Sequence, residues 1–485
     1  MEYCTNVMIV GLVVLVALLP LSARVLVGAI PRRGNEPWSL VLCKFKDSDY
    51  EPRTAEWFSE WISGGNNPDT IENYFSSVSN TIYTIKGSNV TKWLRLPWTR
   101  HEVLRMALMD PRLQSIRDRP FAHSVFRNLA FKMFDKAKQL CISFAEQNGF
   151  TLHRRKITVI NMENTAVYSK DTGVLLTPKL IFSSVLTHEM IHGMNVGHSY
   201  SDRKVQLVSR SRTSLNFVQV FPYAAPGEYD DKYDLMSTAN AHMRLSTYGL
   251  SGPGLNGPHL DYLGWLPQNR IVYFGRDGRT NYTLRLSSLS VPHRLTNGWL
   301  LVMIPYDRDD PGNVYTIEHR TPVGNDVAIK QGAVVVHKVH RIGQSYYSTL
   351  ITHEHGEFDE LTAGTEWLRF LNTNIDGGFQ YIRVKVRIIL LLYICKIIGK
   401  FTSKEVCHGK EVRIPIHASF SLISRGVRSV CIDRNRTITQ NDVDRQYLRQ
   451  AFFVMRRTFG QNECISGYTW RAIDAYDYVC VEPHR

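Results

Sequence analysis

The chain has 485 residues, of which 44% are hydrophobic and 21% are charged. This length exceeds that of one ordinary domain, and this composition excludes a largely disordered chain. The net charge of +14 would favour a polyanionic partner, but residues 205–220 and 381–404 contribute eight basic residues and no acidic one. Without these two segments the charge falls to +6, which requires no nucleic acid as a partner.

Residues 1–29 are predicted to be a signal peptide. The apolar run at residues 7–21 is shorter than the ~20 residues that span a bilayer, and small residues suited to cleavage follow it. Glu2 stands where a signal peptide usually carries a basic residue, so an uncleaved membrane anchor over residues 7–29 is the alternative. N-glycosylation sequons agree with export and begin at Asn89, Asn281 and Asn435. We therefore expect a secreted glycoprotein.

Residues 30–268 have the element order of an α+β domain. A buried strand is predicted at residues 39–45, followed by a long amphipathic helix at 122–147 in which apolar residues recur every three or four positions. Residues 156–162 alternate as a strand, and a second helix begins near residue 181 and continues into a histidine cluster. This order predicts helices packed on a twisted sheet.

The strongest functional signal is the pair His188 and His192 followed by His198. Residues four apart share one face of a helix, so the first two imidazoles can direct a nitrogen at the same ion. His198 can join them only if the helix ends soon after His192 and the chain turns sharply. Residue types that tolerate such a turn are present at Gly193, Asn195 and Gly197. Three neutral histidines leave a fourth position for water, which is typical of a catalytic Zn²⁺ site.

Glu189, next to the first histidine, is the predicted general base. Zinc lowers the pKa of its bound water and polarises a scissile carbonyl, while the carboxylate takes the proton and passes it to the leaving amine. Two other interpretations stay open. The histidines could be ordinary side chains of a buried helix, or the site could bind zinc without turnover.

At these residues the chain resembles the metzincin clan of zinc metallopeptidases, whose extended motif is H-E-x-x-H-x-x-G-x-x-H followed by a methionine-containing turn. Asn195 stands where the clan usually has glycine, and it is the next most tolerant residue for that backbone. The resemblance implies a zinc endopeptidase domain in which Met236 forms an apolar floor beneath the zinc-binding histidines. No tyrosine lies two residues after Met236, so the tyrosine that assists some clan members is not supported.

Further stretches resemble a gametolysin-type or related secreted subgroup, at residues 225–231, 252–258 and 264–266. The resemblance covers roughly residues 36–270, with looser similarity beyond. It implies a protein or peptide substrate from the extracellular matrix or the cell coat.

Residues 269–405 are predicted to form a β-rich domain. Strand-like runs separated by turn residues lie at 282–286, 299–304, 314–319 and 333–339. Within the same region, Asp307, Asp309, Asp310 and Asn313 either ligate calcium or form an acidic β-turn.

The basic segments 205–220 and 381–404 have two interpretations. They are either a surface loop and a buried strand, or non-native sequence such as translated intron, and a transcript read across both junctions decides. The second interpretation would also remove Cys395.

Residues 406–485 are predicted to be a disulfide-stapled tail, because they hold Cys407, Cys431, Cys464 and Cys480. Cys43 and Cys141 both lie in the first domain, and their spacing leaves open whether they pair.

Taken together, the sequence predicts a secreted, zinc-dependent endopeptidase of extracellular proteins. The alternative from another functional class is a non-catalytic adhesion or matrix protein that keeps a structural zinc site.

Overall fold

The computed structural model describes residues 32–65, 67–110, 125–162, 167–170, 173–202, 227–237, 241–274, 281–306, 313–342, 345–351, 360–373, 379–389, 392–399, 411–415, 429–433, 469–470 and 480–481. The predicted signal peptide, the segment 205–220 and the three aspartates of the calcium hypothesis lie outside these residues, as does most of the cysteine-containing tail. Among the residues that are described, no helix has the length and apolar character needed to cross a bilayer.

The N-terminal half is built on a mostly parallel sheet with the strand order β4-β2-β6-β8-β7. Only the edge strand β7 runs antiparallel to its neighbour β8, and a short strand, β5, also pairs with β2. The strands are β2 (Trp38–Lys44), β4 (Asn89–Val90), β5 (Leu94–Arg95), β6 (Arg155–Ile160), β7 (Val167–Lys170) and β8 (Gly173–Leu176). β2 falls where a buried strand was predicted, and β6 falls where an alternating strand was predicted.

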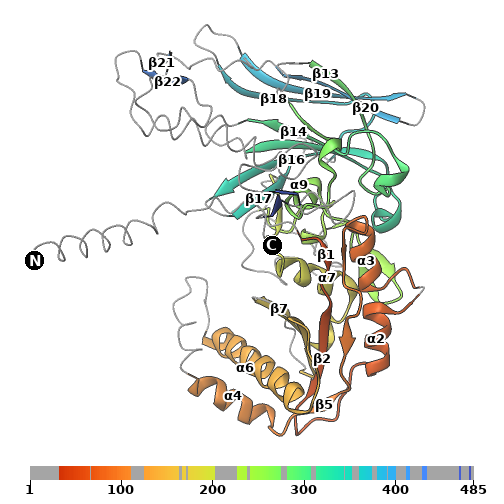
Figure 1. Ribbon diagram of the computed structural model, residues 1–485, viewed down its shortest axis with the longest axis vertical. Helices are drawn as coiled ribbons and strands as arrows, with labels where there is room; N and C mark the ends of the chain where they lie inside the picture. Colours follow the sequence, from red (N-terminus) through yellow and green to blue (C-terminus); the bar gives the residue numbers. More distant parts are fainter. Residues whose placement is uncertain are drawn as a thin grey trace, which may run out of the picture.

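Helices cover both faces of this sheet. Because successive side chains of a strand point to opposite faces, each strand contributes to two cores. Leu40 and Leu42 of β2 enter one core, whereas Val41 and Cys43 enter the other. In Figure 1, α4 (Arg100–Met109) and α6 (Val125–Gln147) lie on one side, and α2 (Ala55–Ser63) and α3 (Ile71–Val78) lie on the other. α7 (Ser183–His192) shares the core of α2 and α3.

The long helix predicted at residues 122–147 is α6, and it is tied to the sheet by a disulfide. Cys141 on α6 is bonded to Cys43 on β2, so the pairing that the spacing left open is formed. Both cysteines lie in the core between α6 and the sheet.

The C-terminal half is a sandwich of one mixed sheet, whose edge strands β12 and β9 pair in parallel with their neighbours, and one antiparallel sheet (Figure 1). One has the order β12-β14-β15-β16-β17-β9 and the other β13-β20-β19-β18. The first contains β9 (Ser199–Ser201), β12 (Ile271–Tyr273), β14 (Leu301–Pro305), β15 (Val314–Arg320), β16 (Ala333–Ile342) and β17 (Ser345–Leu350). The second contains β13 (Asn281–Leu286), β18 (Glu366–Thr373), β19 (Phe379–Ile389) and β20 (Leu392–Gly399). The predicted β-rich character agrees with these strands.

The two halves share one hydrophobic core. Leu301 and Met303 of β14 belong to the same core as the residues of α7, while the alternate residues Val302 and Ile304 belong to the core of the sandwich. β9, which begins directly after His198, pairs in parallel with β17. The domain boundary predicted at residue 268 therefore does not coincide with a break in packing.

Residues 381–399, from the segment suspected to be non-native, form most of β19 and all of β20. β20 pairs with both β13 and β19, and Ile382, Val384 and Val386 are fully buried. These residues are arranged as the buried-strand interpretation expects. A transcript read across both junctions remains the test of whether the segment is native.

Short elements complete the description. They are β1 (Gly34–Asn35), β3 (Tyr83–Thr84), β10 (Arg244–Ser246), β11 (Gly249–Ser251), α9 (Gly257–Tyr262), β21 (Glu411–Pro415), β22 (Ser429–Asp433), β23 (Thr469–Trp470) and β24 (Cys480–Val481), with the 3₁₀ turns η2 (Pro178–Leu180), η3 (Leu235–Ser237), η4 (Gln268–Arg270), η5 (His293–Leu295) and η6 (Gly324–Asp326).

Candidate metal centre

The helix that carries the histidine motif is buried along almost its whole length. Every residue of α7 from Ser183 to Ile191 is buried, which explains why its sequence lacks a polar face. Its first residue is fixed by the indole of Trp61, whose Nε1 donates to Ser183 Oγ at 2.9 Å. At its other end, Arg155 Nη1 donates to Gly193 O at 2.8 Å, placing a cation beside the last carbonyls. Both ends of the helix are therefore held.

A sharp turn after α7 brings the third histidine back toward the first two. The helix ends at His192, and Asn195 adopts φ +64°, in the left-handed region that asparagine tolerates. Gly193 is right-handed at φ −61°, and Gly197 is not among the residues with positive φ. Asn195, at the position where the clan has glycine, is thus the residue that makes the predicted turn.

The turn brings His188, His192 and His198 together. One ring nitrogen from each lies within 4.8 Å of the others, and the Nε2 atoms of His192 and His198 are 2.9 Å apart. The rings of His188 and His192 are perpendicular, with centroids 4.5 Å apart. For N–Zn distances of about 2.0–2.1 Å, tetrahedral geometry separates ligand nitrogens by about 3.3–3.4 Å. The three histidines form a cluster that could hold a metal ion.

The other nitrogen of each ring faces an oxygen acceptor outside the cluster. Nδ1 of His188 donates to Leu235 O at 3.1 Å, and Nδ1 of His192 donates to Val196 O at 2.8 Å. For His198 the acceptor is Glu228 Oε1, at 2.5 Å. These contacts place the ring protons on Nδ1, which leaves the Nε2 lone pairs directed at one another.

This arrangement fits a metal ion. Two neutral imidazoles protonated on Nδ1 would repel each other with their Nε2 lone pairs 2.9 Å apart, unless a cation lies between them. Carbonyl and carboxylate acceptors on the remote nitrogens are the usual partners of metal-ligating histidines.

Burial keeps the two helix histidines unprotonated. It lowers the pKa of His192 to about 4, with a further contribution from His198, and lowers that of His188 well below its ordinary value. Neutral imidazole is the form that binds metals, so both side chains are ready to act as ligands at neutral pH.

Glu189 lies on the same helix between the two ligands and is only 8% exposed. Burial raises the pKa of its carboxyl group to about 8. A bound divalent cation would oppose this shift, because a nearby positive charge favours the carboxylate. Glu189 therefore has the environment of a group that exchanges a proton near neutral pH.

Met236 is fully buried in the 3₁₀ turn η3, which packs against α7. Asp234 fixes the turn, because its carboxylate accepts from Met236 N at 2.9 Å and from Ser199 Oγ at 2.8 Å. Leu235 O also accepts the hydrogen bond from His188 Nδ1. One short turn therefore supports the cluster through both packing and a hydrogen bond.

A buried ionic network on the C-terminal sheet holds the chain around this turn. Arg320 of β15 donates to Tyr233 O at 2.8 Å and pairs with Asp326 at 2.7 Å and Glu318 at 3.1 Å. Burial lowers the pKa of Arg320, but the two carboxylates raise it overall, so the guanidinium stays charged. In the same network, His337 Nε2 lies 2.9 Å from Asp231 Oδ2. The sheet and the metal cluster are therefore one structural unit.

Sequence reasoning missed Glu228 and Tyr229 as individual site residues, although both lie in the stretch 225–231 that carried the narrower resemblance. Tyr229, at φ +61°, packs against His198 with ring centroids 4.0 Å apart and ring planes tilted by 42°. Burial, Glu228 and Glu189 raise its pKa, so its hydroxyl stays protonated. A tyrosine that precedes Met236 in the sequence thus lies beside the cluster.

Comparisons with known proteins give distant structural similarity, of which one solved structure is an example. No family model matches the sequence, and no curated protein matches it. The crystal structure of wild-type OgpA from Akkermansia muciniphila aligns over 67% of this chain and 95% of that chain, with 8% sequence identity and a TM-score of 0.27. A similarity at this level assigns no function.

Proposed function

We propose that this chain is a zinc-dependent endopeptidase whose metal ligands are His188, His192 and His198. The observation that carries the proposal is the convergence of the three imidazoles with their Nδ1 protons already committed to oxygen acceptors outside the cluster. Three neutral nitrogen ligands leave a coordination position for water, which is the pattern of catalytic zinc sites. The metzincin-like order of motif and Met-turn agrees with this function.

A bound zinc ion would supply Lewis acidity, polarising a substrate carbonyl and acidifying a water molecule. Glu189 is the general base: its carboxylate removes a proton from the attacking water and delivers it to the leaving amine nitrogen. Because it is buried, this proton transfer is shielded from bulk solvent.

Two residues position the ligands. Glu228 holds the ring of His198 by accepting its Nδ1 proton, and Met236 fills the apolar space below the cluster. Tyr229 keeps its hydroxyl proton and packs at a tilt against His198, beside the reacting groups.

The proposal includes export and an extracellular protein substrate. The disulfide between Cys43 and Cys141 supports export, since such bonds persist in oxidising compartments. The substrate class rests on the resemblance to secreted peptidases, and no nucleic acid is required.

The test compares the purified full-length chain with a Glu189→Gln variant on a broad unfolded protein substrate, with and without a zinc chelator. We expect chelator-sensitive cleavage that Glu189→Gln reduces by about 10²- to 10⁴-fold. Glu60→Gln, which changes an exposed glutamate on α2, is the matched control and should retain full activity.

Other outcomes of the same experiment would speak against a zinc endopeptidase. Zinc bound by both proteins, with no chelator-sensitive cleavage by the unaltered chain, would favour a non-catalytic adhesion or matrix protein. Cleavage that survives the chelator and the Glu189→Gln change would show a contaminating peptidase and contradict the proposal.

A further inference from the structure

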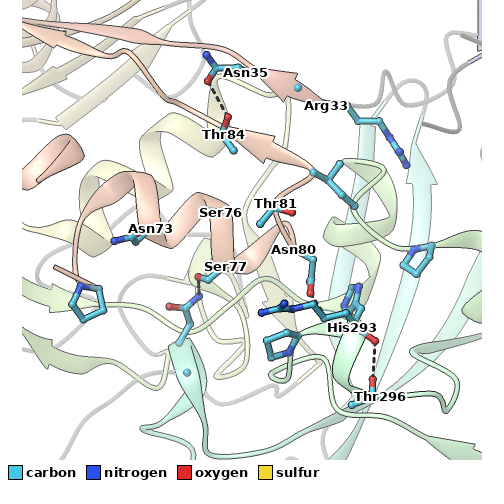
Figure 2. A pocket seen from close by; sticks show the side chains of 18 of the residues that line it. Arg33, Asn35, Asn73, Ser76, Ser77, Asn80, Thr81, Thr84, His293 and Thr296 are labelled. Carbon is cyan, nitrogen blue, oxygen red and sulfur yellow. Dashed lines mark hydrogen bonds between the residues drawn. The ribbon is translucent and has the colours of Figure 1, made fainter. Parts of the chain in front are cut away.

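A second candidate ligand site lies in a cavity of about 1500 Å³ that none of the cluster histidines lines. It is bounded by the end of α3, the paired strands β1 and β3, and segments near η4, η5 and η6 (Figure 2). Small-molecule pockets usually measure about 300–1,000 Å³. The cavity is thus large enough for an oligomeric ligand.

The charged side chains that line the cavity are mostly cationic. The only acidic one among the lining residues is Asp69, and Arg244 pairs with it at 2.7 Å. Asp69 also accepts from Thr247 N at 2.8 Å, so its carboxylate is already occupied. The lining guanidinium groups belong to Arg33, Arg244, Arg270 and Arg294. This imbalance favours an anionic ligand.

One of these cations is fixed in place without a carboxylate partner in the described part of the chain. Arg270 donates only to neutral oxygens: His293 O at 2.7 Å, Gly298 O at 2.8 Å and Thr296 Oγ1 at 2.9 Å. A guanidinium that is oriented but not neutralised presents a ready positive charge to a sulfate or carboxylate.

Buried nitrogens without partners also line the cavity. His293 is 9% exposed, and its Nε2 makes no hydrogen bond with any residue that the structure describes. Within the same described set, Arg244 Nε has no acceptor. Buried polar atoms are nearly always paired, so two unpaired nitrogens in residues that line the cavity mark an unusual wall.

The wall between α3 and β3 is strained and polar. Asn80 and Thr81 both have positive φ, at 53° and 66°. For Thr81, which is β-branched, this backbone conformation is a true outlier. Strain of this kind is often stored at ligand sites. Asn80 Oδ1 accepts from His293 N at 2.8 Å, and Asn325 Nδ2 donates to Ser77 Oγ at 2.8 Å. With the residues that the structure describes, the second polar atom of each amide makes no hydrogen bond, so it can bind a ligand hydroxyl.

From these features we infer that the cavity binds an acidic oligosaccharide. The guanidinium groups match its sulfate or carboxylate groups, and the amides and hydroxyls around them match its ring hydroxyls. No phenylalanine, tyrosine or tryptophan is among the lining residues, so the cavity lacks the stacking platform that nucleic acid bases use.

The test measures binding of a fluorescent heparin hexasaccharide to the full-length chain by anisotropy at physiological salt. Arg294→Ala removes an exposed lining charge and should weaken binding at least fivefold. Arg105→Ala removes an exposed charge on α4, outside the cavity, and should change affinity less than twofold. Circular dichroism confirms that both variants are folded.

Further probes identify the ligand chemistry. A hyaluronate hexasaccharide, which carries carboxylates but no sulfate, distinguishes the two anionic groups, and neutral maltohexaose should not bind. Equal weakening by Arg294→Ala and Arg105→Ala would show diffuse attraction to the net charge and overturn the inference. Tighter, Arg294-dependent binding of a single-stranded oligonucleotide, or no binding of either acidic saccharide, would also overturn it. All measurements include a zinc chelator, so their outcome does not depend on the peptidase proposal.

Discussion

Glu228 Oε1 lies 2.5 Å from Nδ1 of His198, on the side of the ring opposite to the nitrogen that faces His192. Backbone pairing holds the glutamate there, because Tyr200 and Glu228 form an antiparallel bridge and Tyr229 N donates to Ser199 O at 2.9 Å. Thus a residue 30 positions along the chain fixes the tautomer of the third histidine.

Removing this carboxylate should weaken metal binding without unfolding the protein. We expect Glu228→Ala to reduce zinc affinity about 10- to 100-fold, the usual effect of losing a partner that orients a ligand. Competition with a chromophoric chelator measures the affinity. Glu146→Ala, at an exposed glutamate on α6, is the control and should bind zinc like the unaltered chain. Equal affinities in all three proteins would contradict the role given to Glu228.

The metal-free protein should lose stability in mild acid. Burial lowers the pKa of His192 from 6.5 to about 4, so its contribution to stability is complete above pH 6.5 and is lost as the pH falls toward 4. Between pH 7.5 and pH 5 the loss from this residue should be about 2 kcal/mol, with a further loss from His188. Chemical denaturation of the chelator-treated chain at pH 7.5 and pH 5 measures it. A His192→Asn variant should show a smaller difference between the two pH values.

Glu189 should have the opposite pH dependence. Its pKa is raised from 4.5 to about 8, so the stability gained from its neutral form is complete below about pH 4.5 and is lost as the pH rises through 8. In the metal-free protein, Glu189→Gln should therefore stabilise the fold at pH 8 relative to the unaltered chain, on the order of 2–4 kcal/mol, and by much less at pH 5. Zinc should shrink the difference, since it favours the carboxylate. A constant difference across this pH range would count against burial of an ionisable Glu189.

Arg320 should be among the most destabilising positions to change. Arg320→Met leaves Asp326 and Glu318 buried without their cation, which typically costs about 3–5 kcal/mol. Because Arg320 also holds Tyr233 O, the loop that carries Met236 should loosen and zinc affinity should fall as well. Thermal denaturation and zinc titration measure the two effects. Arg383→Met removes an exposed ion pair with Glu366 and should change neither.

The local parts of this molecule could be predicted from the sequence. The spacing of His188 and His192 on one helix face, the turn after His192, and the strands β2 and β6 depend on residues close in the chain. Even here the prediction was partial, because it did not say which of three residues would adopt positive φ. The structure assigns that role to Asn195.

The long-range parts could not be predicted. Glu228 is carried to His198 by strand pairing, and β9 joins β17 of the C-terminal sheet, which no local periodicity encodes. The charged residues Glu318 and Arg320 lie on β15, and both are fully buried. A sequence pattern identifies such residues only as charged. Their burial depends on partners from distant parts of the chain, which the pattern does not contain.

The most direct test of the account is zinc-edge X-ray absorption on the purified full-length chain, combined with its zinc content. The account predicts one zinc per chain, with three imidazole nitrogens at about 2.0–2.1 Å and one further light-atom ligand, and loss of this signal in a His192→Ala variant. A chain without zinc, or a spectrum dominated by sulfur ligands at about 2.3 Å, would contradict it.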